Sequence, residues 1–173
     1  PPSCGEVSAN KSANVGALIF IVTLFGSVLI IAYHPPFVQR FLNKEEIEGV
    51  HTSENLPDEA MAVGDSFEIE LAVLNILKNA LKAAKNSLNP QTSVSVTAQK
   101  HMWKITITDN GPKISEEIFS ALGRPTSTSK KDGLGVGLSI VLSIIENNGG
   151  HLTFRRIEPN GIAVDLFVKK KEE

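Results

Sequence analysis

Three polar side chains recur along the stretch Glu68–Ala84, at a spacing that suits a metal ion and a phosphate. At 3.6 residues per turn of helix, Asn75, Asn79 and Lys82 fall on one side as i, i+4 and i+7. Asparagine is only a middling helix former, so the pair indicates either a solvated polar face or amide oxygens that ligate a hard cation such as Mg²⁺. In the second case, Lys82 would neutralise phosphate charge one turn further on.

A second group of residues directly follows a predicted strand. Ile105–Thr108 alternates in the strand manner, and Asp109 comes next, at the head of the sequence Asp-Asn-Gly-Pro. The carboxylate can accept a hydrogen bond from an exocyclic amine, and Gly111 lets a flat ring approach the backbone. The same four residues are also ordinary turn formers, so the motif alone leaves both interpretations open.

A glycine-rich segment precedes a predicted helix that begins near residue 136. Gly133, Gly135 and Gly137 alternate just after Lys130, and backbone N–H groups at such a helix start bind phosphate oxygens. The segment is not a dinucleotide fingerprint, because no βαβ unit surrounds it, and it is not a P-loop, because no Gly-Lys-Ser or Gly-Lys-Thr closes it. The glycine spacing alone is therefore weak evidence.

The elements that would position these groups belong to an α+β domain. Capping residues and apolar periodicity predict helices over Asp65–Ser87, Ser115–Leu122 and Val136–Asn147. Alternating residues predict strands over Val50–Ser53, Ser93–Ala98, Met102–Thr108, His151–Ile157 and Ile162–Val168, the last two joined by a Pro-Asn-Gly turn. We expect one mixed, mostly antiparallel sheet covered on one face by helices.

The N-terminal part of the chain contains a long apolar stretch. No charged side chain occurs from Ser12 to Gln39, and a helix of about 20 apolar residues crosses a bilayer. We expect a polar tail over residues 1–12, a transmembrane helix over 13–34, a linker over 35–47 and the folded domain over 48–171. The alternatives are a buried hydrophobic hairpin and a signal-peptide core, and the latter is disfavoured because no small-residue cleavage site follows. Arg40 and Lys44 favour a cytoplasmic domain behind a single inner-membrane span.

Charge and cysteine content exclude other classes of protein. The formal net charge of −2 gives no global basic field, so we expect no nucleic-acid partner. The lone Cys4 rules out an intramolecular disulfide framework. Four scattered histidines make no metal-ligand cluster with it.

Taken together, in this order and spacing, the three motifs resemble the GHKL ATPases and, among them, the ATP-binding catalytic domain of sensor histidine kinases. The asparagine-bearing helix is similar to the N box, and the segment around Asp109 to the first glycine box. Glu117–Lys130 is similar to the phenylalanine box and ATP lid, and Gly133–Gly150 to the second glycine box. The resemblance implies a Bergerat-type ATP-binding sandwich.

The resemblance also implies cofactors and roles. ATP and Mg²⁺ would be the cofactors, with Asn79 and Asn75 as the catalytic pair that holds the metal against the triphosphate. Asp109 would bind the adenine amino group. The nucleotide-binding set would be Lys82, Asp109, Gly111, Lys130, Gly133, Gly135, Gly137 and Leu138.

Two further positions bear on the activity. GHKL hydrolases carry a glutamate general base four residues before the equivalent of Asn79, whereas this chain has Asn75, which cannot take a proton. That difference fits the kinase branch. Lys113 stands where the first glycine box usually has its second glycine, and this departure bears on nucleotide binding and on the motion of the lid.

The phosphate acceptor is not evident in the sequence. His34 is followed by two prolines, and too few residues separate them from the domain for a helical dimerisation hairpin. We therefore expect the acceptor histidine on a dimerisation domain outside this segment or on a partner chain, with a response regulator as the next partner. The alternatives are a membrane-anchored nucleotide-binding or interaction module without kinase activity, and a serine kinase of the anti-sigma type.

Overall fold

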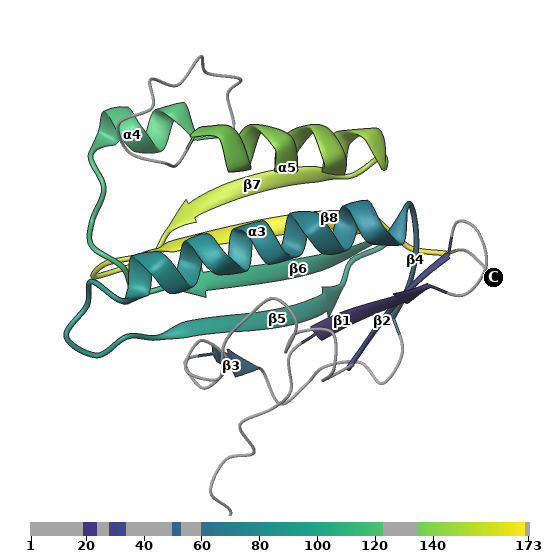
Figure 1. Ribbon diagram of the computed structural model, residues 1–173, viewed down its shortest axis with the longest axis horizontal. Helices are drawn as coiled ribbons and strands as arrows, with labels where there is room; N and C mark the ends of the chain where they lie inside the picture. Colours follow the sequence, from purple (N-terminus) through teal and green to yellow (C-terminus); the bar gives the residue numbers. More distant parts are fainter. Residues whose placement is uncertain (1–18, 24–27, 34–49, 53–59, 123–134, 172–173) are drawn as a thin grey trace, which may run out of the picture.

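The computed structural model describes residues 19–23, 28–33, 50–52, 60–122 and 135–171. In chain order the elements are β1 (Ile19–Thr23), β2 (Val28–Tyr33), β3 (Val50–Thr52), β4 (Ala60–Val63), α3 (Ser66–Ala84), β5 (Thr92–Ala98), β6 (Met102–Asp109), α4 (Glu116–Ala121), α5 (Gly135–Asn147), β7 (His151–Arg156) and β8 (Ile162–Lys169) (Figure 1).

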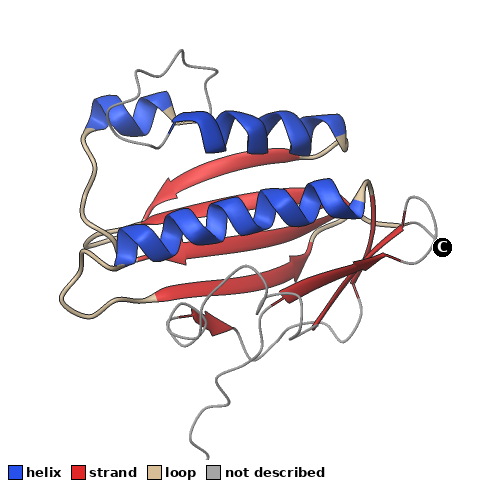
Figure 2. Cartoon of the chain, in the orientation of Figure 1, coloured by secondary structure: helices blue, strands red, loops and turns tan. Residues whose placement is uncertain are grey.

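The main sheet has the strand order β3-β5-β6-β8-β7. All its pairs are antiparallel except β3 with β5, which is parallel. Helices α3 and α5 run side by side across one face of the sheet, α3 over β5 and β6 and α5 over β7 and β8 (Figure 2). The expected α+β architecture, with helices on one face of a mostly antiparallel sheet, is confirmed.

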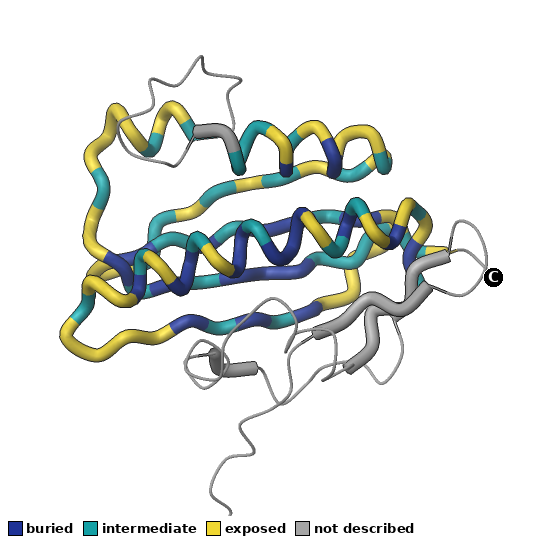
Figure 3. Tube along the Cα trace, in the orientation of Figure 1, coloured by how far each residue is buried: buried dark blue, intermediate teal, exposed yellow. Residues whose placement is uncertain are grey.

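The core lies between this helix layer and the sheet. Helices α3 and α5 each turn an apolar stripe inward, while β5 alternates buried and partly exposed positions as a strand with one covered face does (Figure 3). The largest fully buried side chains are Ile69, Leu77, Ile105, Ile107, Ile145, Leu166, Val141, Val168 and Thr92. Each buried leucine or isoleucine stabilises the fold by about 1.5–3 kcal/mol relative to exposure.

A polar clamp joins the start of α3 to the end of α5. Asp65 caps α3 by accepting a hydrogen bond from the Glu68 N–H at 3.0 Å. Asn148, just past α5, accepts from the Asp65 N–H at 2.6 Å and donates to the Glu68 carboxylate at 2.9 Å. Gly64 allows this close approach, because a Cβ there would lie 2.8 Å from the Asn148 amide oxygen and its φ is +152°.

The predicted transmembrane helix over residues 13–34 is wrong where the structure describes that stretch. β1 and β2 pair as antiparallel strands with Ile19 opposite Tyr33, and β2 also pairs with β4. Both segments are rich in isoleucine and valine, which favour strands when a pairing partner is present. Of the helices in the described ranges, none has the length and apolarity needed to cross a bilayer.

Replacing Asn148 with alanine should destabilise the domain by about 1–3 kcal/mol, because the Asp65 N–H and the Glu68 carboxylate lose their partner. Urea unfolding followed by circular dichroism measures the change. The control is Asn147→Ala, which removes the neighbouring exposed amide. Equal losses in the two variants would contradict a clamp at this corner.

Candidate nucleotide-binding site

An apolar cavity of about 90 Å³ lies between the helix layer and the sheet. Its lining comes from α3, β6, α5, β7, β8 and the residue after α4, and comprises Ile76, Asn79, Ala80, Ala83, Asp109, Leu122, Leu138, Phe154, Ile162 and Val164. Only Asn79 and Asp109 in this set have polar side chains. Its composition, apolar with a few placed polar groups, is that of small-molecule sites, although its volume is below the roughly 300–1,000 Å³ usual for them.

Asp109 is the last residue of β6 and is only 9% exposed. Its carboxylate accepts a hydrogen bond from the Gly111 N–H at 2.7 Å. Burial raises the pKa of Asp109 above its usual value, although the backbone N–H groups of Gly111 and Ile162 act in the opposite direction. A buried carboxylate oxygen at the wall of an apolar cavity is suited to accept from an amine on a flat ring.

Gly111 sits where the loop after β6 meets α3. A Cβ at this position would lie 2.7 Å from the Asp109 carboxylate and 2.8 Å from the Ala83 Cβ. Both distances are shorter than side-chain contacts allow, so only glycine lets this loop pass between the helix and the carboxylate.

Asn79 and Asn75 lie one turn apart on α3 and have different neighbours. Asn79 lines the cavity. Asn75, one turn earlier, donates to the Leu71 carbonyl at 2.8 Å, and a Cβ on Gly137 would lie 3.9 Å from its amide oxygen. The first turn of α5 therefore faces Asn75, which brings helix N–H groups toward the amides of α3.

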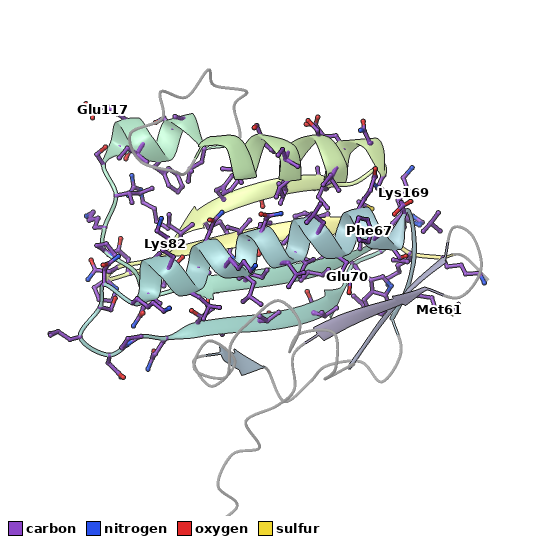
Figure 4. All side chains as sticks on the ribbon, viewed as in Figure 1. Met61, Phe67, Glu70, Lys82, Glu117 and Lys169 are labelled. Atoms are coloured by element: carbon purple, nitrogen blue, oxygen red, sulfur yellow. The ribbon has the colours of Figure 1, made fainter. Side chains whose placement is uncertain are left out.

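The remaining predicted site residues are placed as follows. Leu138 lines the cavity beside Asn79 and Asp109. Lys82 is exposed on the last turn of α3, at the same end of the molecule as Glu117 of α4 (Figure 4). Gly135 begins α5, whereas Lys130 and Gly133 lie outside the described residues.

Sequence reasoning missed the apolar walls of the cavity. Ile76, Ala80 and Ala83 share a face of α3 with Asn79, and their i, i+4, i+7 spacing was a usable signal. Phe154 and Leu122 had no comparable signal, because their place in the wall depends on how distant segments pack.

Comparison with known proteins identifies the family. The family model described as "Histidine kinase-, DNA gyrase B-, and HSP90-like ATPase" matches residues 64–172. The chain belongs to this ATPase family. The resemblance seen in the three motifs is thereby confirmed.

Curated relatives include the C4-dicarboxylate transport sensor protein DctB of Rhizobium meliloti and sporulation kinase B of Bacillus subtilis. DctB is 33% identical over 114 residues, which cover 66% of this chain and 18% of DctB. Sporulation kinase B is 31% identical over 114 residues, covering 66% of this chain and 26% of the kinase. The chain thus spans about a fifth to a quarter of the length of these relatives.

Solved structures share the fold. The mycobacterial sensor histidine kinase MprB superposes with a TM-score of 0.61 at 22% identity, covering 80% of this chain and 90% of that one. The histidine kinase domain of the E. coli osmosensor EnvZ gives a TM-score of 0.59 at 22% identity, with coverages of 80% and 84%. The sheet and helix arrangement described above is therefore that of histidine kinase domains.

Alanine substitutions at Gly111 and Gly137 should affect the stability of the domain differently. Gly111→Ala should cost about 1–3 kcal/mol of unfolding free energy, because the new methyl group meets Asp109 and Ala83. Gly137→Ala should be neutral or up to about 1 kcal/mol stabilising, because its nearest neighbour is at 3.9 Å and alanine favours helix. Thermal and urea unfolding of both variants measure this, and similar losses in the two would contradict the packing described.

Proposed function

We propose that this domain binds ATP with Mg²⁺ and transfers the γ-phosphoryl group to a histidine outside the segment, as the catalytic domain of a sensor histidine kinase in two-component signalling. The observation that carries the proposal is the buried Asp109 carboxylate in the wall of an apolar cavity that α3, α5 and the sheet line together.

The cavity suits an adenine ring. Its walls are aliphatic and aromatic, which favours a flat, uncharged ring. Asp109 would accept a hydrogen bond from the exocyclic amino group, and Gly111 would let the ring approach the backbone. Leu138 would pack against the nucleotide from the first turns of α5.

The polar side chains of α3, among them Asn79 in the cavity lining, suit a magnesium triphosphate. Among the described residues, no group of three or more His, Cys, Asp or Glu side chains could hold a metal. The amide oxygens of Asn79 and Asn75 are hard ligands of the kind that Mg²⁺ accepts when phosphates and water complete its shell. Mg²⁺ would neutralise charge on the phosphates. Lys82, Lys130 and the backbone at Gly133, Gly135 and Gly137 would do the same from the protein side.

The position four residues before Asn79 favours transfer over hydrolysis. Asn75 occupies it and donates its amide to the Leu71 carbonyl, so no side chain there can activate water as a base. Phosphoryl transfer by positioning and charge neutralisation needs no such base on the nucleotide domain. The acceptor would be a histidine on a dimerisation domain, and an aspartate on a response regulator would receive the phosphate next.

Cellular location is part of the proposal. We place the domain on the cytoplasmic side of the inner membrane, where ATP is available.

The alternative of an interaction module without kinase activity rested partly on Lys113. The structure places Lys113 on the surface, and it is not among the residues that line the cavity. A side chain at this position therefore leaves the adenine side of the site open.

Calorimetric titration with ATP and Mg²⁺ tests the proposal. The unmodified chain should bind saturably, and Asp109→Asn should weaken binding by about 10–100-fold, because it removes a hydrogen bond to a charged acceptor. Glu158→Gln, an exposed change in the β7–β8 turn, is the control and should bind as the unmodified chain does.

A second variant separates the two halves of the site. Asn79→Ala should weaken binding of Mg²⁺·ATP more than binding of adenosine, because the metal is held only against phosphates. No saturation at millimolar ATP with a folded sample would overturn the proposal and favour the interaction module.

A further inference from the structure

Helix α4 has an unusual dependence on one side chain of the sheet. None of the six residues of α4, all of which the structure describes, is buried. A helix this short is unstable by itself, and it gains no anchorage from the core. Its position must therefore come from contacts at its surface.

Arg156, the last residue of β7, makes those contacts. Its guanidinium donates to the Ile114 carbonyl at 2.9 Å, to the Ser115 carbonyl at 3.4 Å and to the Glu116 carboxylate at 2.8 Å. The same group lies 4.3 Å from the centre of the Phe119 ring. Within the part of the chain that the structure describes, no other strand side chain hydrogen bonds to the Ile114–Leu122 segment.

The carbonyl bonds matter more than the ion pair. The Glu116 side chain is 81% exposed, so water screens its attraction to the guanidinium. The Arg156 side chain is only 26% exposed, and its planar fork reaches the loop carbonyls and the carboxylate at once. The contact thus fixes the loop that leads into α4 as well as the helix itself.

The position of α4 affects the cavity. Leu122, the residue directly after α4, is one of the residues that line the cavity. Phe154 lies two residues before Arg156 on β7 and lines the same cavity. Strand β7 therefore contributes Phe154 to the cavity wall and, through Arg156, also holds α4, which is followed by Leu122 in that wall.

We propose that Arg156 is a positioning residue for nucleotide binding: it holds the Ile114–Leu122 segment against the sheet so that Leu122 completes the adenine side of the cavity. This inference rests on the proposed function for the identity of the ligand. Arg156 does not line the cavity, so it acts on affinity through α4 rather than by touching the nucleotide.

The test compares Arg156→Ala with a matched neighbour. Arg155 lies next to it on β7, and its side chain instead pairs with Asp165 at 2.7 Å. Arg156→Ala should raise the Kd values for adenosine, ADP and ATP alike, by about tenfold, while leaving the melting temperature nearly unchanged, because α4 buries no residue. The Kd values of Arg156→Lys should lie between those of the unmodified chain and of Arg156→Ala, since one ammonium group cannot reproduce the planar fork of the guanidinium. Arg155→Lys should bind as the unmodified chain does.

Amide exchange gives a second readout that needs no ligand. The N–H groups of Ile118 and Leu122, which bond to Ser115 and Phe119, should lose protection in Arg156→Ala and keep it in Arg155→Lys. If the unmodified chain binds no adenine compound, the proposed function fails, and exchange alone decides whether Arg156 positions α4.

Three outcomes would overturn the inference. They are unchanged exchange in Arg156→Ala, lost protection with unchanged affinity, and a loss confined to ATP that spares adenosine. The last of these would mean that Arg156 acts on the phosphates directly.

Discussion

An ionised carboxylate is unstable away from water unless hydrogen-bond donors surround it. The end of β6 meets that requirement for Asp109, with N–H groups from Gly111 on one side and Ile162 on the other. Ile162 opens β8 directly opposite Asp109 in the sheet register, and Gly111 passes against Ala83 of α3. One helix and two strands therefore converge on this carboxylate, and the cavity beside it exists because they do.

A second carboxylate in the same sheet shows how the surroundings decide the role. Burial would raise the pKa of Asp165, but hydrogen bonds from Arg155 and Thr106 outweigh it and hold that pKa below its usual range. Asp165 is thus fully partnered by side chains and serves structure. Asp109 has only backbone donors and a raised pKa, so its carboxylate keeps capacity to accept a bond from a ligand. Perturbed groups of this second kind concentrate at functional sites.

The sequence predicted the domain well where local chemistry decides the outcome. The helices predicted to start at Asp65 and Ser115 do begin there, with these residues as their caps, and the predicted β7–β8 hairpin is present. Asn79, Asp109 and Leu138 meet in one cavity, as the three motifs implied, because each motif lies on or beside an element that local periodicity identifies.

The sequence-based predictions failed where contacts between distant segments determine the structure. The length and lack of charge of the run over residues 13–34 favour a transmembrane helix, whereas the strands seen in its described part depend on pairing with each other and with the distant β4. Arg156 was overlooked because it bonds mainly to backbone carbonyls, which leave no mark in the sequence of their own segment.

The central claim, that Asp109 accepts a hydrogen bond from an adenine amino group, is tested most directly by following the carboxyl carbon of Asp109 by NMR across a pH titration. In the free domain, the pKa should lie above the ordinary aspartate value because of burial. Saturating adenosine should lower it, because a donor to the charged form favours that form. A titration curve that saturating adenosine leaves unchanged would contradict the account.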